Sequence, residues 1–208
     1  MTTILQTPCV SENFLYLADR ILNYTVLMIN GAPHRICEIE FYLNSPTHTD
    51  GYVHGHTDQT KKGTWYFHRF NNGTYKAGNY KGVDIVLGSP NEHAAVLIRA
   101  IYDINNQKFI EGPCLTVNHI LSLSNVDSVL ALTNNESLNI LNNSRGLALI
   151  EGPPTRVDPI FYGPRIGLSN KYPDYRDRKY RYTLGQMNKN GNAVSMSKKE
   201  RSTLVQVK

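Results

Sequence analysis

The sequence lacks most of the features that mark secreted, membrane-spanning and zinc-binding proteins. Its three cysteines, Cys9, Cys37 and Cys114, lie far apart and form no CxxC pair. This pattern suits buried thiols in a reducing compartment and gives no zinc signature. The longest apolar runs, such as residues 26–29 and 94–98, are too short to cross a bilayer, and the N-terminus carries no standard secretion signal. We therefore expect an intracellular protein with no membrane partner.

Acidic residues are scarce in the last quarter of the 208-residue chain. From Arg156 onward twelve Lys or Arg accompany four acids, whereas the first 155 residues carry ten against thirteen, and the formal net charge is +5. Such asymmetry indicates a polyanionic partner, because Lys and Arg gain affinity by neutralising phosphates. The alternative is a solvated basic tail. We predict that residues 1–188 form a single domain and that residues 189–208 form a flexible basic tail.

Hydrophobic patterning predicts an α+β domain. Residues 12–23 have the spacing of an amphipathic helix, Gly112-Pro113 opens a helix that runs to residue 123, and residues 125–132 form a third. Apolar runs at 25–29 and 34–43 flank Asn30-Gly31, a dipeptide that favours a β-hairpin turn. Residues 44–62 form a long polar loop. The other expected strands of a mixed or antiparallel sheet are 64–70, 75–80, 83–87, 94–102, 147–150, 156–162, 165–168 and 179–184.

Two carboxylates and a phenol share one face of the strand at 35–43. Its odd positions from Cys37 to Leu43 are apolar, so Glu38, Glu40 and Tyr42 alternate onto the other face. In a pocket wall, one glutamate would activate water and the tyrosine ring would stack on a flat substrate. The alternative is a half-exposed strand whose acids lie in water.

Histidines and aspartates gather in the loop that follows this strand. They could converge on a metal ion, as a metal-dependent hydrolase would require, but no HExxH or Cys-His pattern accompanies them. Polar surface histidines are the commoner outcome, so we expect no metal. The candidate residues are His48, Asp50, His54, His56, Asp58 and, further on, His68.

Basic and aromatic residues alternate between Lys61 and Lys81, without a single acid. Nucleic-acid surfaces combine these types, because cations hold phosphates while rings stack on bases or wedge between them. Half of the rings would instead be core if the segment is a hairpin. Arg99 stands in an apolar strand and needs a partner, which could be a phosphate, a catalytic carboxylate or a structural ion-pair partner.

Six segments, in order, resemble the alkyladenine (3-methyladenine) DNA glycosylase family, from about Leu17 to about Leu184. The segment EIEFYL resembles the family's ETEAYL, GTWYF resembles GTLYV, and VLIRAI resembles VLLRAL. The segments LADRILNYTVLM, EGPCLTVNHIL, and GPRIGL followed by RKYRYTL resemble the family's opening helix and strand, its GP-plus-helix segment and its closing PRIGI and RFY strands. We identify the chain as a divergent member of this family.

The resemblance implies a single α+β domain with a curved, mainly antiparallel sheet, similar to the C-terminal domain of formyltransferases. It implies a monomeric DNA repair enzyme without a cofactor, nuclear in a eukaryote and cytoplasmic in a bacterium. Such an enzyme flips a damaged purine out of DNA and hydrolyses its N-glycosidic bond. Glu40 then corresponds to the general base, Tyr42 to a base-stacking ring and Arg99 to the arginine near the catalytic water. No lysine matches a Schiff-base nucleophile, so lyase activity is not expected.

Other positions match the family less closely. Its second base-contacting ring corresponds to His54, His48 or His56, and we choose His54. Asp84 stands where the family has an asparagine, and its charge would favour cationic bases. An insertion, FNNGTYKAGNY, alters the hairpin that enters the duplex. Tyr75 is then the candidate wedge, and the expected DNA contacts also include Lys76, Tyr80, Lys81 and Arg165. These departures leave a rival interpretation, a non-catalytic nucleic-acid-binding protein with the same fold.

Overall fold

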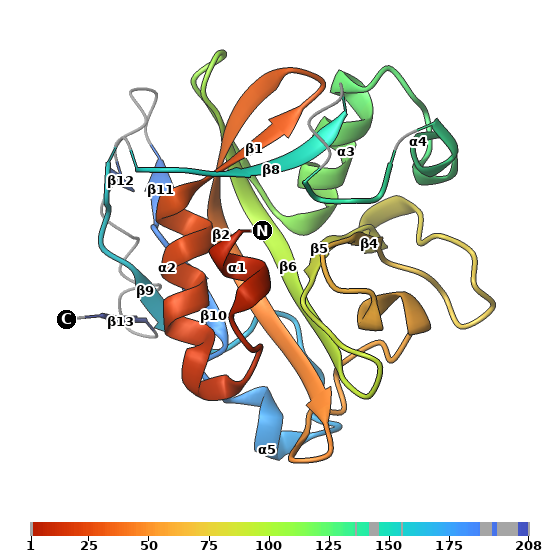
Figure 1. The fold of residues 1–208 in the computed structure, drawn as a ribbon, viewed down its shortest axis with the longest axis vertical. Coiled ribbons are helices and arrows are strands. Elements are labelled where there is room, and N and C mark those ends of the chain that lie inside the picture. The colour runs from red at the N-terminus through yellow and green to blue at the C-terminus, as the bar shows by residue number, and fades with distance from the viewer. Residues whose placement is uncertain are drawn as a thin grey trace.

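A long central strand, β2 (Ala32–Ser45), organises the fold (Figure 1). A computed structural model describes residues 2–135, 137–141, 146–154, 156–187, 193–194 and 204–207. On one side β2 pairs with β6 (His93–Asp103), and on the other with β10 (Arg181–Thr183). The main path of the sheet has the order β13-β9-β10-β2-β6-β5-β4, and every strand pair in it is antiparallel. The chain is therefore an α+β domain built on an open, mainly antiparallel sheet.

The remaining strands extend this sheet at its ends and edges. They are β1 (Thr25–Ile29), β3 (His48–Thr49), β4 (Trp65–Phe67), β5 (Val83–Val86), β7 (Lys108–Glu111), β8 (Leu147–Glu151), β9 (Phe161–Gly163) and β13 (Val205–Gln206). The pair β11 (Gln186–Met187) and β12 (Ala193–Val194) forms a separate small sheet. The predicted turn between β1 and β2 is confirmed, since Asn30 and Gly31 both have positive φ, 46° and 81°, as a two-residue hairpin turn requires.

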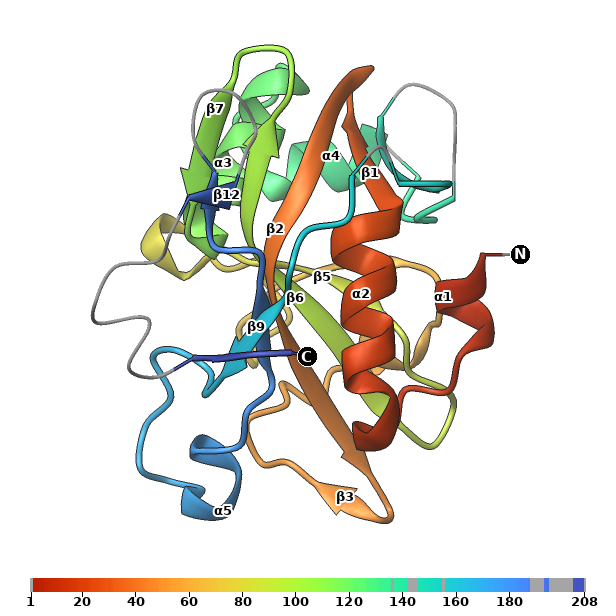
Figure 2. The ribbon, with the colours of Figure 1, turned by 90° about the vertical axis from the view of Figure 1, so that its left-hand side faces the viewer.

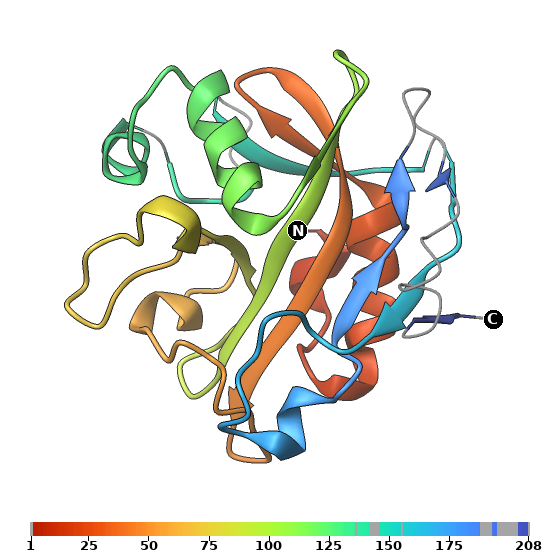
Figure 3. The same ribbon diagram turned by 180° about the vertical axis from the view of Figure 1, so that it is seen from behind.

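Helices cover the sheet at two places. The helix α2 (Phe14–Tyr24) follows the short α1 (Thr3–Gln6) and η1 (Ser11–Asn13) and packs against β2 and β10 (Figure 2). Its Phe14 ring stacks on Phe41 of β2 at 4.3 Å between centroids. The helix α3 (Pro113–Leu123) packs against β6 and β7, followed by α4 (Val129–Asn135) (Figure 3). None of the described helices has the length and apolar composition needed to cross a bilayer.

Several predicted boundaries are wrong. The strand expected near 75–80 is absent, since Tyr75 forms only an isolated β-bridge with Arg69 and the 3₁₀ helix η3 (Gly78–Tyr80) follows. Residues 165–168 form no strand, and the long polar loop contains β3 and the 3₁₀ helix η2 (Thr57–Thr60). The short helix α5 (Pro173–Arg176) was not expected.

The predicted tail, residues 189–208, lies mostly outside the described residues, which include only 193–194 and 204–207 of it. Those described positions are in strands or next to one: β12 pairs with β11, and β13 pairs with β9. Leu204 is buried. At its far end the tail segment therefore adds an edge strand to the main sheet.

Candidate active-site pocket

A carboxylate is buried at the middle of β2. Glu40 has no exposed surface, so the alternative of a solvated strand face is wrong for this residue. The predicted alternation is confirmed, because Glu38, Glu40 and Tyr42 lie on one face while Ile39 and Phe41 enter the core. The Tyr42 hydroxyl donates to Oε2 of Glu40 at 2.9 Å.

Arg99 reaches the same carboxylate from β6. The pairing of β2 with β6 shifts register between Glu38 and Ile39, which pair with Ala100 and Ile98, so Arg99 has no cross-strand partner. Such a β-bulge redirects a side chain. The Arg99 guanidinium donates to Oε1 of Glu38 at 3.0 Å and to Oε2 of Glu40 at 3.3 Å. The three residues that the family resemblance selected therefore meet at one place.

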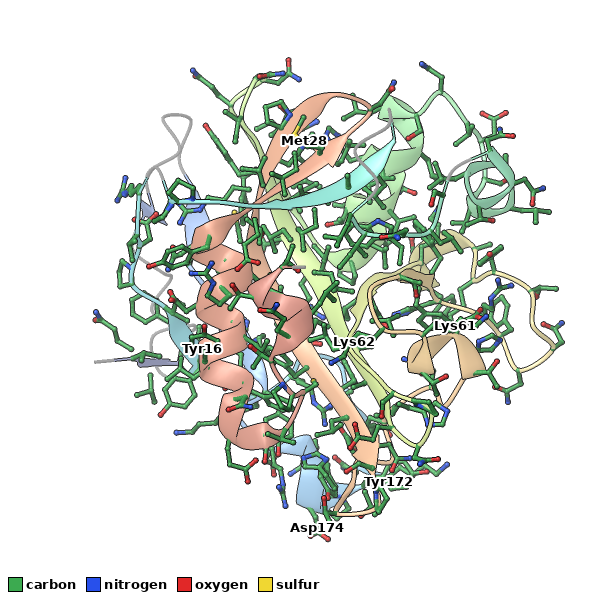
Figure 4. All side chains as sticks on the ribbon, in the orientation of Figure 1. Tyr16, Met28, Lys61, Lys62, Tyr172 and Asp174 are labelled. Carbon is green, nitrogen blue, oxygen red and sulfur yellow. The ribbon has the colours of Figure 1, made fainter. Side chains whose placement is uncertain are left out.

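The segment after β9 closes this site. The backbone N–H of Ile166 donates to Oε1 of Glu40 at 2.7 Å. Further along, the Tyr52 hydroxyl donates to the carbonyl of Ser169, and the rings of Tyr52 and Tyr172 meet edge to face at 5.1 Å between centroids. Figure 4 labels Tyr172 at the lower end of the molecule. The loop that contains Tyr52 and the loop that contains Ser169 and Tyr172 are far apart in sequence, and they contact each other near the end of β2.

Burial sets the proton affinity of Glu40. Desolvation raises its pKa, the charge of Arg99 and the hydrogen bonds from Ile166 and Tyr42 offset this in part, and nearby Glu38 adds to the rise. A carboxylate offers about four acceptor positions. Three are occupied, two on Oε2 and one on Oε1. One position on Oε1 has no hydrogen-bond donor, and a water molecule would reach it only after neighbouring groups move, because Glu40 has no exposed surface.

Tyr42, whose hydroxyl contacts this carboxylate, lines a small cavity of about 130 Å³. Glu40 itself does not line the cavity, and Tyr42 is the residue that connects the two. For comparison, an apolar cavity of about 150 Å³ admits a benzene molecule. The cavity is therefore of the size of one flat ring, with aromatic and polar walls. Its lining residues are Tyr42, Tyr52, His54, Gln59, His68, Asp84 and Leu168.

One wall of the cavity is a hydrogen-bonded group of polar residues. His68 contacts Oδ1 of the buried Asp84 at 2.8 Å. The carboxylate of Asp84 is therefore in direct contact with the imidazole of His68. The rings of His54 and His68 meet edge to face at 4.4 Å between centroids, and Lys76 Nζ lies 3.1 Å from Nε2 of His54. Desolvation of the ring, with contributions from His68 and Lys76, lowers the pKa of His54 to about 4.

His54 is the histidine of the loop that lines the cavity. His48 is instead buried between the carbonyl of Leu43 and the hydroxyl of Tyr180, and His56 accepts from the backbone N–H of Asp58. Asp50 forms a buried ion pair with Arg165 at 2.5 Å. The loop residues therefore form no metal-binding cluster within the described part of the chain, where the one group of suitable geometry lies elsewhere.

A larger groove of about 700 Å³ adjoins the small cavity and shares His54 with it. Its lining combines basic and aromatic side chains, which include Arg69, Lys76, Tyr66 and the 45% exposed Phe70. The basic and aromatic segment that the sequence singled out thus divides into core rings, such as Trp65, and groove residues.

Two predicted DNA contacts need correction. Arg165 is buried, pairs with Asp50, donates to the carbonyl of Phe41 and lies 4.6 Å from the ring centroid of Tyr42, so it holds the pocket wall and does not face solvent. Tyr75 packs beneath the Arg69 guanidinium at 3.8 Å, and its hydroxyl accepts from Arg69 at 2.6 Å, so it is not free to insert into a duplex.

Exposed candidates remain on the same loop. The side chain of Tyr80 is 72% exposed, and Lys81 next to it is half-buried. The basic C-terminal quarter contributes less to the surface than its composition indicated, because Arg181 also lies buried, 3.4 Å from Glu38.

Several residues of the pocket have no predicted role at this site. The sequence marks His68 only as a candidate metal ligand, although alternation with the buried Trp65 and Phe67 places it on the opposite face of this segment. Tyr52, Gln59, Ile166 and Leu168 had no local signal, since each is placed by contacts between distant loops.

Comparison with known proteins identifies a related protein whose activity is not characterized. No protein-family model matches the chain. An uncharacterized protein of Acanthamoeba polyphaga mimivirus is 39% identical over 186 residues, which cover 83% of this chain and 86% of that protein. The chain therefore belongs to the same family as this mimivirus protein.

Proposed function

We propose that the protein is a monofunctional DNA glycosylase, with the formyltransferase-like fold of the alkyladenine glycosylases, that removes an alkylated or otherwise damaged purine. The observation that carries the proposal is the double role of Tyr42. Tyr42 lines the cavity of about 130 Å³, and its hydroxyl donates to the buried Glu40. The two fused rings of a purine need more room than this cavity offers, so they would extend into the groove that shares His54 with it. A flat ligand stacked there would bring its attached sugar close to the carboxylate. The six ordered sequence segments support the same conclusion.

The chemistry requires one base and one water molecule. The free acceptor position on Oε1 of Glu40 would hold the water, and the raised pKa makes this carboxylate a better proton acceptor than a solvated glutamate. The water oxygen attacks the sugar carbon and its proton moves to Glu40. The carbon–nitrogen bond breaks, and its electron pair leaves with the base, which alkylation or protonation makes a better leaving group.

The groove beside the cavity supports DNA as the substrate. Arg69 and Lys76 can hold phosphates, Phe70 can stack on a base, and His54 connects the groove to the cavity. The exposed Tyr80 is the proposed wedge that fills the space left by the flipped base.

The proposed reaction includes no lyase step. Lys76 is the lysine held beside His54, and it does not line the small cavity. Trapping with borohydride should therefore give no covalent complex with abasic DNA. A trapped complex that disappears in Lys76→Met would instead make the enzyme bifunctional.

The decisive experiment measures base release. Alkylated duplex DNA is incubated with the protein, and released bases are identified by mass spectrometry. Glu40→Gln should bind the duplex as tightly as the wild type and release bases about 10²- to 10⁴-fold more slowly, because the general base is lost. Glu12→Gln, which changes an exposed glutamate, is the matched control. Equal rates for wild type and Glu40→Gln would remove Glu40 from this role.

The rival is a non-catalytic DNA- or RNA-binding protein, and the altered hairpin favours it. It would bind nucleic acid with a steep salt dependence and release no base from any damaged substrate. The absence of released bases from the wild type, with binding intact, would replace the glycosylase proposal by this one.

A further inference from the structure

We propose a second site, separate from the pocket, in which His34, Asp103 and His119 hold one divalent transition-metal ion such as zinc. Three elements bring these residues together. His34 lies near the start of β2 and pairs with Asp103 at the end of β6, and His119 projects from α3, which packs against β6. The ligand atoms of the three side chains all lie within 4.8 Å of one another.

The distances between these atoms suit a tetrahedral ion. His34 Nε2 lies 2.9 Å from His119 Nε2, and Oδ2 of Asp103 lies 3.7 Å and 3.5 Å from these two nitrogens. Ligand atoms at about 2.0–2.1 Å from a tetrahedral zinc ion stand about 3.3 Å apart. One of the three separations is shorter than this value and two are longer, so small rotations of the side chains would bring the three atoms to a tetrahedral arrangement. The fourth position of the ion would be left for water.

Neighbouring groups orient the ligands as in metal centres. Nδ1 of His34 lies 3.0 Å from the carbonyl of Ala32, which can only accept. Nδ1 therefore carries the proton, and Nε2 directs its lone pair into the cluster. Asn106 holds the carboxylate, since its backbone N–H and side-chain amide donate to Asp103 at 3.0 and 2.8 Å. Hydrogen bonds of this kind fix the tautomer and orientation of metal ligands.

Charge gives an independent reason for a cation. Asp103 is 1% exposed, and its ion-pair partners in the described part of the chain are the two histidines alone. Among the other buried carboxylates, Glu40, Asp50 and Asp158 each contact an arginine, and Asp84 contacts His68. A buried charge needs a partner or a metal.

The ion would join α3 to the sheet and has no place in the proposed hydrolysis. Residues 34 and 40 stand six positions apart on β2, which separates the two sites by about 20 Å. The first turn of α3 contacts the loop of the proposed wedge, because Cys114 Sγ donates to the carbonyl of Gly78 at 3.1 Å. The metal would thus stabilise the helix against which the Tyr80 loop rests.

The test uses zinc alone as the probe. The full-length protein is dialysed against a chelator, reloaded with Zn²⁺, desalted and analysed for bound metal. We expect one zinc per chain and a higher melting temperature with zinc than without. His119→Gln keeps a group that can hydrogen-bond to His34 but removes a ligand, and it should weaken zinc binding at least tenfold. His93→Gln, which changes a histidine at the other end of β6, should bind zinc like the wild type.

Folding of each variant is checked by circular dichroism. If His119→Gln does not fold, Asp103→Asn replaces it, because the side chain of asparagine can still accept from Asn106. Less than a tenth of an equivalent of zinc on the wild type would overturn the proposal. Equal zinc binding by the wild type and the ligand variants would also overturn it. Neither result bears on base release, which is measured separately.

Discussion

Two buried carboxylates of the same sheet are set up for opposite tasks. Glu40, in the middle of β2, and Asp103, at the end of β6, are both almost fully buried. Burial alone would raise the pKa of each. For Glu40 burial prevails over Arg99, Ile166 and Tyr42, and the pKa is raised. For Asp103 burial is outweighed by the hydrogen bonds from Asn106, with His34 and His119 acting in the same direction, and the pKa is lowered.

The difference shows that the neighbours of a carboxylate decide its chemistry more than its depth does. A carboxylate with a raised pKa accepts a proton readily, as a general base must. A carboxylate that stays ionised is suited to hold a cation. The comparison also separates two groups of histidines. In the cavity His68 faces Asp84 while His54 faces Lys76, whereas His34 and His119 face one another.

After Glu40→Gln, the largest effect is expected from removing the positive charge beside Glu40. Arg99→Met should raise the pKa of Glu40 further, because the charge of Arg99 lowers it. Only the ionised carboxylate activates water, so base release falls as the pH falls through the pKa of Glu40. In the wild type this decline lies above the value of about 4.3 for a solvated glutamate. In the variant it moves to higher pH, and release near neutral pH falls about tenfold or more.

The measurement is single-turnover base release across pH 4 to 9, on a purine that N-alkylation has made permanently cationic. Such a base needs no protonation to leave, so the acidic decline reports on the enzyme. Arg99→Lys keeps the charge and should restore the position of the decline in part. A decline at the same pH in Arg99→Met and the wild type would show that Glu40 is not the titrating group.

The central strand could be predicted from the sequence, but the contacts by which Arg99 and Arg165 complete the pocket could not. Alternation along residues 35–43 identified the face of Glu40 and Tyr42, because a two-residue period is a local property. The β-bulge that turns Arg99 toward Glu40 depends on the register of two strands. Arg165 was predicted to face DNA, but its partner Asp50 stands 115 positions away, so nothing local revealed its burial. The cluster at His34 was missed for the same reason, since His119 is 85 positions from it.

The next prediction concerns how the damaged base enters the pocket at Glu40. A base reaches Glu40 after it leaves the duplex, and the exposed Tyr80 would fill its place. Tyr80→Ala should slow base release from duplex DNA about tenfold, since unstacking costs a few kcal/mol without the wedge. Release from single-stranded DNA should be unchanged. Tyr16→Ala is the control, an exposed tyrosine on α2 that Figure 4 shows far from Lys61. A duplex rate unaffected by Tyr80→Ala would assign insertion to another residue.

The smallest effect is expected at the proposed metal site, from a change in the hydrogen bonds to Asp103. The side chain of Asn106 donates to Oδ2 of Asp103, and its backbone N–H donates to Oδ1. Asn106→Ala removes the first hydrogen bond and keeps the second. Loss of a group that orients a metal ligand weakens binding about 10- to 100-fold, and we expect the lower end because one bond remains. Zinc titration against a competing chelator measures the change, with Asn105→Ala, an exposed neighbour, as control. Base release from single-stranded DNA, which needs no wedge, should not change. If Asn106→Ala slowed base release as much as it weakened zinc binding, the two carboxylates would be coupled, and their separation into two sites would be wrong.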